Sequence, residues 1–303
     1  MKICDRVSEI EDVLLMLQQQ IISQLEREDG QARFCHDRWE KREQLQGYGE
    51  TCVLEEGAAI EKAGVNFSKV EGQVLPLSIV QKRPELQGAS YLAMGVSLVI
   101  HPRNPYAPIT HANIRFFCTG TDHWWFGGGM DLTPIYLFEE DCTHWHQQLK
   151  QCCDAYAPDL YPRLKKWCDD YFYLPHRNEY RGIGGIFFDD LCEWEFARCL
   201  SFAKSVGEHF IPAYLPLLQK RKQMHYGEKE RAFQLYRRGR YVEFNLVYDQ
   251  GTRFGLQSGG RIESILMSLP PMSSWKYNWK VEKSSNEELL MSYLQHSPRD
   301  WVL

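Results

Sequence analysis

The segment from Tyr91 to Asp131 concentrates side chains that can do chemistry. It holds His101, His111, Arg115 and Asp131. Imidazole changes charge near neutral pH, a guanidinium group binds carboxylate or phosphate, and a carboxylate accepts hydrogen bonds. Such a concentration rarely serves packing alone, so we expect a site carried by rigid elements.

Strands are expected to position the two histidines. The hydrophobic run 98–100 leads into His101, a proline-rich loop from Pro102 to Pro108 follows, and His111 opens the next strand. Both imidazoles are therefore expected at the mouth of one hairpin. Aromatic and β-branched residues joined by turns predict an antiparallel meander. Its strands are expected at Tyr91–His101, Ala112–Thr119 and His123–Gly127.

Other elements follow from apolar spacing and from turn residues. Helical spacing is found at Val7–Leu25, Phe138–Tyr156, Pro158–Tyr173, Glu193–Val206 and Pro212–Tyr226. Glycines punctuate Ala32–Ser90 and predict short strands and loops, and a glycine-flanked strand is expected at Ile183–Asp190. Tyr241–Tyr248 and Phe254–Ser258 flank the turn residues 249–252 and are expected to form a hairpin. We expect an antiparallel sheet throughout.

Composition limits the class of protein. With 303 residues and 44% hydrophobic content, the chain can bury a large core, and we expect one domain over residues 1–303. A formal charge of −5 argues against a nucleic-acid partner. The ten cysteines form no Cys-x-x-Cys pattern and are typical of reduced cytoplasmic thiols. No apolar run reaches the roughly 18 residues of a membrane span, so we expect a soluble, cytoplasmic protein.

Four histidines lie at element boundaries or on helix faces beside charged residues: His101, His111, His146 and His176. Any one of them alone is more often a hydrogen-bonded structural histidine than a ligand. They lack the spacing of His-Glu-x-x-His, so a metal site would have to be assembled from distant segments. Both interpretations stay open at this point.

Asp131 follows the glycine run 127–129, which lets the backbone approach a bulky ligand closely. A carboxylate in that position can face the ligand. The alternative is a tight turn in which Asp131 caps a helix beginning near Thr133 and Pro134. The neighbouring Trp124 and Trp125 are expected in the core or in a pocket wall.

Arginines beside glycines recur at predicted strand ends. Arg115 lies in a strand, Arg177 and Arg181 precede the glycine-rich turn 182–185, and Arg261 follows Gly259-Gly260. A further group, 237–240, precedes the expected hairpin. An exposed arginine is usually only a solvated charge, but the recurrence in an acidic protein indicates an anionic small molecule. The 182–185 turn is not a dinucleotide fingerprint, because it precedes a strand instead of opening a helix.

These motifs resemble oxygen-dependent coproporphyrinogen-III oxidases over nearly the whole chain. The segments that carry the resemblance are Gly95–Pro102, His111–Phe117, Trp124–Pro134, Tyr161–Asp169, Tyr171–Asp190 and Arg237–Pro271. The resemblance implies oxidative decarboxylation of two propionates, on rings A and B of coproporphyrinogen III, to vinyl groups. The product is protoporphyrinogen IX in haem biosynthesis. It also implies molecular oxygen as co-substrate, no organic cofactor, and for some members a divalent metal cation such as manganese or iron.

The resemblance also implies roles for individual residues. His111 would donate a proton, Asp131 would bind the pyrrole N–H groups, and Arg115 would hold a propionate. The substrate site would be lined by Ser97, Asn113, Ile114, Arg115, Gly259, Gly260 and Arg261. A metal would be held by His101, His111, His146 and His176, or these histidines would instead form a hydrogen-bonded structural cluster.

The resemblance implies a fold and an assembly as well. The fold is α+β, with a large antiparallel sheet flanked by helices on both faces in three layers. A homodimer would form through roughly Tyr241–Lys276, whose alternate apolar positions suit an interface or the core equally well. Lys41–Thr51 has only two glycines where relatives carry a continuous run, so a loop over the substrate there is expected to behave differently.

Two rival hypotheses remain from the sequence. One is a non-catalytic tetrapyrrole-binding protein whose arginines hold propionates without chemistry, and it predicts binding without product. The other is a metal-dependent oxygenase of another substrate, which would need redox-active iron. The presence of His111, Arg115 and Asp131 argues for turnover, although residues alone do not establish it.

Overall fold

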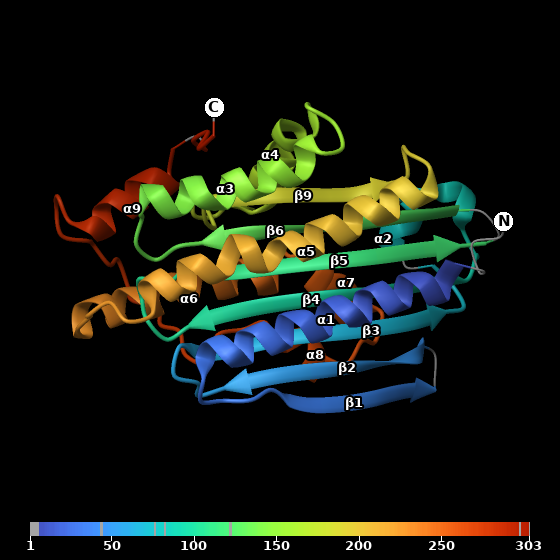
Figure 1. The fold of residues 1–303 in the computed structure, drawn as a ribbon, viewed down its shortest axis with the longest axis horizontal. Coiled ribbons are helices and arrows are strands. Elements are labelled where there is room, and N and C mark those ends of the chain that lie inside the picture. The colour runs from blue at the N-terminus through green and yellow to red at the C-terminus, as the bar shows by residue number, and fades with distance from the viewer. Residues whose placement is uncertain are drawn as a thin grey trace.

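The computed structural model describes residues 6–42, 45–75, 77–81, 83–120, 123–296 and 298–302. Its centre is a seven-stranded antiparallel sheet in the order β1-β2-β3-β4-β5-β6-β9. The strands are β1 (Cys35–Arg42), β2 (Leu45–Glu55), β3 (Ile60–Gly72), β4 (Tyr91–Pro102), β5 (Ile109–Thr119), β6 (His123–Thr133) and β9 (Gly184–Leu191). Strands β7 (Tyr173–Leu174) and β8 (Glu179–Tyr180) form a separate pair. The expected antiparallel sheet is confirmed (Figure 1).

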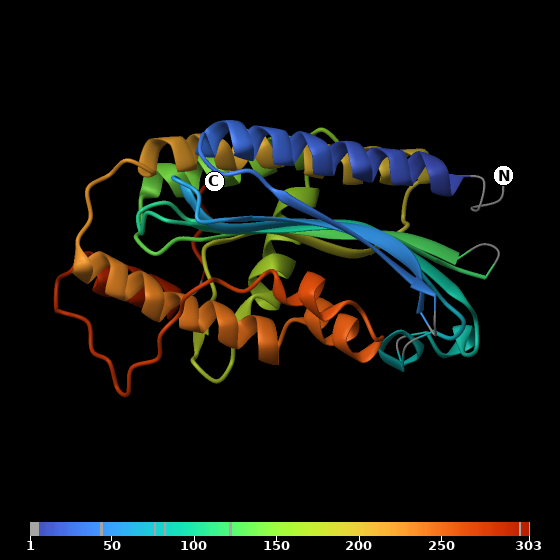
Figure 2. The same ribbon diagram turned by 90° about the horizontal axis from the view of Figure 1, so that it is seen from below.

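Helices cover both faces of this sheet. Their bounds are α1 (Val7–Asp29), α2 (Leu77–Val80), α3 (Glu139–Asp154), α4 (Leu160–Tyr171), α5 (Phe196–Arg221), α6 (Glu228–Val247), α7 (Gln250–Gln257), α8 (Ile262–Leu266) and α9 (Asn286–Leu294), with a 3₁₀ turn at Pro84–Leu86. Figure 2 shows α1 and α5 on one side of the sheet and α6 to α8 on the other. We call these sides the α5 face and the α6 face. The expected three-layer α+β fold is confirmed, and no helix in the described ranges is both long and apolar enough to cross a bilayer.

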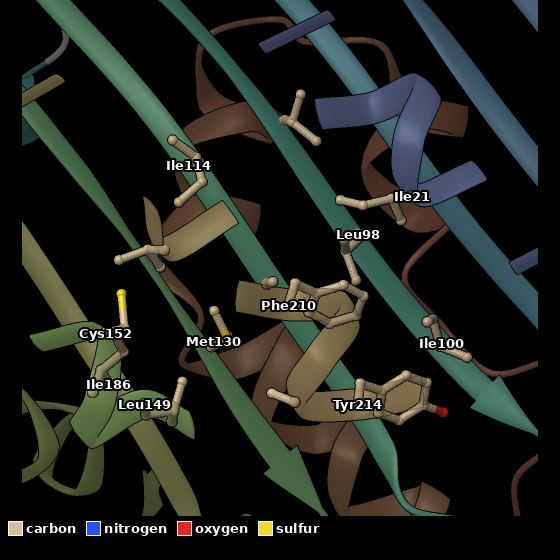
Figure 3. Close-up of a cluster of buried hydrophobic side chains, with 14 of the residues drawn as sticks. Ile21, Leu98, Ile100, Ile114, Met130, Leu149, Cys152, Ile186, Phe210 and Tyr214 are labelled. Carbon is tan, nitrogen blue, oxygen red and sulfur yellow. The ribbon is translucent and has the colours of Figure 1, made fainter. Parts of the chain in front are cut away.

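The α5 face holds the main hydrophobic core. Strand residues alternate between the two faces, and the α5 face receives Leu98, Ile114 and Met130 from neighbouring strands. They pack against Phe210 and Tyr214 of α5 (Figure 3). The residues between them, at odd positions of β4, β5 and β6, therefore point to the α6 face.

Helix α5 corrects the prediction of two helices at Glu193–Val206 and Pro212–Tyr226. It is continuous through Pro212 and Pro216. Each internal proline removes a backbone hydrogen bond, at a cost of about 3 kcal/mol. The long buried face of α5 offsets this cost, and the Tyr214 hydroxyl anchors the helix by donating to the Pro108 carbonyl at 3.1 Å.

The segment Ala32–Ser90 is also corrected, because β1, β2 and β3 are long strands where short strands and loops were expected. Four of its glycines, at 47, 49, 64 and 72, lie within strands, where some of them allow close packing. A Cβ at Gly49 would lie 2.3 Å from the Trp39 ring, and one at Gly64 would lie 1.9 Å from Sδ of Met267. In the segment 41–51, residues 43 and 44 lie outside the described residues, and the flanking residues belong to β1 and β2.

The predicted hairpin at Tyr241–Tyr248 and Phe254–Ser258 is wrong, since these residues lie in α6 and α7. The arginines at 237–240 likewise lie within α6 and do not precede a strand. Asp249, taken as a turn residue, is the N-cap of α7 and accepts a hydrogen bond from the Thr252 backbone N–H at 2.7 Å. Turns and helix N-caps favour the same short polar residues, which explains the error.

Candidate active site

The candidate site lies on the α6 face over β4, β5 and β6. Cross-strand register places Ser97, Asn113 and Gly129 in one row, and Gly95, Arg115 and Gly127 in the next. A third row contains Val99, His111 and Asp131. Ser97, His111, Asn113 and Arg115 are only half-buried, so this strip of the sheet offers polar groups to a ligand.

Hydrogen bonds connect these polar side chains into a chain. Arg115 donates to Oδ1 of Asn113 at 3.0 Å, which leaves the Asn113 amide N–H groups to face Nε2 of His111 at 3.3 Å. Nδ1 of His111 lies 3.0 Å from Oδ1 of Asp131. An ionised carboxylate only accepts, so Nδ1 carries the hydrogen and Nε2 is the ring nitrogen turned toward the open strip.

Asp131 is buried and paired with Arg181, which donates to its two carboxylate oxygens at 2.7 and 2.8 Å. Burial alone would raise the pKa of Asp131, but the Arg181 guanidinium and the hydrogen bond from His111 outweigh it and lower the pKa. Arg181 also donates to Oδ1 of Asn245 at 3.0 Å. The carboxylate is therefore held ionised beneath the His111 ring.

Aromatic rings enclose the Arg181 guanidinium. Its centre lies 4.0 Å from the Phe172 ring and 4.7 Å from the rings of Tyr241 and Phe244. These rings come from the end of α4 and from α6, so two segments distant in the sequence hold one charge. Cation–π contacts of this kind are stronger in a water-poor setting.

Gly127 makes room for Arg115. A Cβ at this position would lie 2.6 Å from Nε of Arg115 and 2.8 Å from Oδ1 of Asp189. Without it, the guanidinium crosses β6 and reaches Asp189 on β9 at 3.1 Å. Arg115 remains about one-third exposed, which leaves it accessible to an anionic ligand.

Gly259, Gly260 and Arg261 lie between α7 and α8, at the other side of the same sheet face. Arg261 donates to Asp37 of β1 at 2.6 Å. Asp37 and Asn113 belong to one cross-strand row but are four strand spacings apart, or roughly 19 Å. The two candidate arginines thus mark opposite sides of a broad surface.

Other sequence-predicted residues are not all on this surface. The Ile114 side chain points to the α5 face and lies in the hydrophobic core, so only its backbone belongs to the strip (Figure 3). Trp124 also points that way and packs against Phe196, whereas Trp125 stacks on Phe117 at the α6 face. Asp131 lies within β6, and the residues after it do not begin a helix until Glu139, so the helix-cap alternative is wrong.

The four histidines make separate contacts. His101 is fully buried and its Nε2 lies 2.9 Å from the Ser268 carbonyl oxygen. His146 is also buried, with Nε2 at 3.1 Å from the Ile183 carbonyl and Nδ1 at 2.9 Å from the Tyr161 hydroxyl. Burial holds the pKa of His101 well below its usual range and lowers the pKa of His146 to about 3. Both rings are therefore neutral.

His176 also makes a contact of its own, because its Nε2 pairs with Glu243 at 2.7 Å. Among the described residues, no three of the predicted histidines bring ring nitrogens within 4.8 Å of one another. Hydrogen bonds already use both nitrogens of His146. The four rings do not fit a single metal ion in this arrangement, and we derive no catalytic step through one.

Glu243 provides a pH-dependent contribution to stability. It accepts from His176, from Arg177 and from the Trp275 indole. Burial alone would raise its pKa, but these hydrogen bonds outweigh it and lower the pKa to about 2 from its usual 4.5. A depressed carboxyl pKa stabilises the fold fully above pH 4.5, and this stabilisation is lost as the pH falls toward 2.

The Glu243→Gln variant is therefore expected to be less stable than the wild type at neutral pH and to lose less stability in acid. Urea unfolding at several pH values between 7 and about 2 would measure the difference. Glu193→Gln is the control, because Glu193 forms an exposed ion pair with Arg163 that is expected to contribute little. A constant gap between Glu243→Gln and the wild type at every pH would contradict the assignment.

Arg181 is the functional residue whose role the sequence did not reveal. It was noted only as one of several arginines beside glycines. Its partners Asp131 and Asn245 are 50 and 64 positions away in the chain. The one usable signal was an arginine directly before the glycine-rich turn that leads into β9.

A histidine held by a buried carboxylate–arginine pair, beside a partly exposed arginine, is an arrangement suited to an enzyme that acts on an anionic molecule. The chain belongs to the coproporphyrinogen III oxidase family, whose model it matches over residues 9–301. It is 53% identical to the oxygen-dependent coproporphyrinogen-III oxidase of Francisella tularensis subsp. holarctica strain OSU18, over 98% of this chain and 99% of that protein. The protein of the same name from strain LVS is 52% identical over the same shares.

Proposed function

We propose that this chain catalyses the oxygen-dependent oxidative decarboxylation of coproporphyrinogen III in haem biosynthesis. The propionates on rings A and B become vinyl groups, giving protoporphyrinogen IX. Each propionate loses one β-hydrogen and carbon dioxide, and two electrons pass to molecular oxygen. The observation that carries the proposal is the chain Arg115–Asn113–His111–Asp131 on an open strip of the sheet, in a member of this family.

The position of each group supports a distinct role. Arg115 is partly exposed and binds a propionate, exchanging its present partner Asp189 for the ligand. His111 is the proton donor when its ring is doubly protonated, because Nε2 faces the strip while the Asp131 carboxylate accepts from Nδ1 and stabilises the positive charge. Asp131 orients His111, and Oδ2 keeps one acceptor position that a pyrrole N–H group can use.

Ser97, the backbone of Ile114 and the turn containing Arg261 complete the proposed substrate surface. Coproporphyrinogen III carries four propionates on a wide macrocycle, which suits arginines placed at opposite sides of one sheet face. Gly95 and Gly127, on either side of Arg115 in one row, add no side chains of their own to the sheet surface that would face the pyrrole rings. We further propose that residues 1–303 act as a single domain in the cytoplasm.

The proposal is tested by mixing anaerobically prepared coproporphyrinogen III with metal-stripped protein and then admitting air. Separation of the porphyrins, with fluorescence detection after oxidation, would identify the vinyl product. Product without added metal supports the oxidase and a reaction independent of a metal. Product that forms only after manganese or iron is restored would show that a metal takes part in the reaction and would support the four histidines as its ligands. Tight binding of the substrate without product would favour the tetrapyrrole-binding alternative.

Arg115→Ala is expected to raise the KM for coproporphyrinogen III by about 10- to 100-fold, because a charge-assisted hydrogen bond to a propionate is lost. Steady-state kinetics would measure the change. Arg163→Ala is the control, since Arg163 is an exposed arginine of α4 that pairs with Glu193. An unchanged KM in Arg115→Ala would remove Arg115 from the substrate site.

We also propose a homodimer through Tyr241–Lys276. Six large apolar side chains in this range are exposed, which is typical of a surface that a partner covers. They are Leu246, Val247, Leu256, Ile262, Met272 and Trp275. Sedimentation at micromolar concentration is expected to give the mass of two chains, and Val247→Asp is expected to give one. The control Val74→Asp, at an exposed valine outside the range, should leave the dimer intact.

A further inference from the structure

Strands β1 and β2 carry a second group of chemically active side chains on the α5 face, opposite the candidate active site. His36 and Cys52 are direct cross-strand partners, and Glu50 lies two positions before Cys52 on the same strand face. The His36 side chain is half exposed, the Glu50 side chain is mostly buried, and Cys52 is fully buried. The group therefore runs from the core to the solvent at the edge of the sheet.

The distances within this group match those of a metal site. Nδ1 of His36 lies 3.4 Å from Sγ of Cys52 and 3.4 Å from Oε1 of Glu50, and all three ligand atoms lie within 4.8 Å of one another. In a tetrahedral zinc site, bonds of about 2.3 Å to sulfur and about 2.0 Å to nitrogen and oxygen place these pairs about 3.5 and 3.3 Å apart. The three side chains need little movement to bind one ion.

An independent observation concerns Gln18 of α1, which covers Cys52. Gln18 is 1% exposed, and its Nε2 donates to the carbonyls of Glu50 and Val65 and approaches Sγ of Cys52 at 3.6 Å. Its Oε1 is buried and has no hydrogen-bond partner among the described residues. A buried polar oxygen without a partner is costly and calls for an explanation, such as an ion or water at that position.

We propose that His36, Glu50 and Cys52 bind one zinc ion, with the fourth position taken by water. Thiolate, imidazole and carboxylate form a ligand set that zinc accepts. One thiolate also disfavours magnesium and calcium, which prefer oxygen ligands alone. This group shares no residue with the four histidines considered above.

The present contacts allow the ion to enter. Arg38 donates to Oε1 of Glu50 at 2.8 Å, but its side chain is almost fully exposed and can leave at little cost. A bound dication would displace the proton of the Cys52 thiol. Zinc would then replace the contacts of His36 with Cys52 and with Glu50 by stronger coordination bonds.

An ion bound at this site would link β1 to β2 at the edge of the sheet. Within the part of the chain that the structure describes, β1 has a strand neighbour on one side only, which leaves an edge that needs protection. Asp37, next to His36, pairs with Arg261, and Thr51, between Glu50 and Cys52, contacts the Ser264 hydroxyl at 2.6 Å. The ion would therefore stiffen strands whose opposite face holds α8.

Cobalt(II) provides the test, as a coloured substitute for zinc. Full-length protein stripped with a chelator and desalted is expected to bind one Co²⁺ per chain, with a thiolate-to-metal charge-transfer band that zinc removes. Cys52→Ala should abolish the band, and His36→Ala should weaken binding by about tenfold or more. Cys35→Ser is the matched control, because Cys35 is exposed and its side chain points to the other face.

Thermal unfolding gives a second readout if Cys52→Ala fails to fold. Zinc is expected to raise the Tm of the wild type and of Cys35→Ser but not that of His36→Ala, whose exposed side chain is dispensable for folding. The proposal is overturned if the wild type shows no charge-transfer band at excess Co²⁺. It is also overturned if the band persists in both Cys52→Ala and His36→Ala.

Discussion

Asp131→Asn is expected to lower kcat by about 10²- to 10⁴-fold while the protein still folds. Arg181 needs an acceptor, so the new amide oxygen faces Arg181 and the amide N–H groups face Nδ1 of His111. Nδ1 must then accept a hydrogen bond, which moves the ring hydrogen to Nε2 and reverses the hydrogen bond with Asn113. The ring is then held neutral beside an amide that cannot stabilise an imidazolium, and a neutral imidazole is a far weaker acid, so it donates a proton poorly. Single-turnover kinetics would measure the effect.

Asp141→Asn is the matched control for this experiment. Asp141 is also a buried carboxylate, and it binds Arg221 at 2.7 and 2.9 Å on another part of the molecule. Its replacement is expected to lower the free energy of unfolding without changing kcat. Full turnover by Asp131→Asn would remove Asp131 from the catalytic machinery, whereas equal losses of kcat in both variants would point to a general effect of destabilisation.

Arg181→Met is expected to destabilise the fold by about 3–5 kcal/mol, because it leaves the buried carboxylate of Asp131 without its charge partner. The pKa of Asp131 should rise, since burial remains while the main opposing charge is removed. The His111 ring then faces a carboxyl group that holds its proton more tightly, and activity is expected to fall with stability. Urea unfolding and kinetics on the folded fraction would separate the two effects.

The double variant Asp131→Asn/Arg181→Met tests whether the stability lost in Arg181→Met comes from the unpaired charge of Asp131. It is expected to be more stable than Arg181→Met alone, since neither buried charge remains, while activity stays low because His111 has lost its carboxylate. Arg221→Met is the control and should lose stability but retain kcat, as Arg221 pairs with Asp141 outside the site. A double variant no more stable than Arg181→Met would contradict the pairing as the source of the loss.

The central meander was predictable from sequence because its strands combine aromatic and β-branched residues with clear turns. Strict alternation along β5 also puts His111, Asn113 and Arg115 on one face without any knowledge of the rest of the fold. The N-terminal strands were misread because Gly49 and Gly64 interrupt them. In the folded chain these glycines leave space for a tryptophan ring and a methionine side chain. Such contacts join different segments of the chain, so a local sequence pattern does not reveal them.

The C-terminal region was misread for a related reason. Tyr241 and Phe244 have high strand propensity, but both are buried at helical spacing on α6, where they pack against Arg181. Tertiary packing overrode propensity in this segment. The same contact explains why the role of Arg181 was missed, since the ion pair with Asp131 exists only after β9 and α6 are in place.

The order of the chain also decides when the site is completed. Strands β1 to β6 are neighbours both in sequence and in the sheet, so they can pair as the chain leaves the ribosome. Asp131 is then placed in the sheet while its partner Arg181 is still 50 residues away and Asn245 is further behind. This carboxylate can be buried together with its charge partner only after Arg181 has been synthesised, so the centre of the site depends on the second half of the chain.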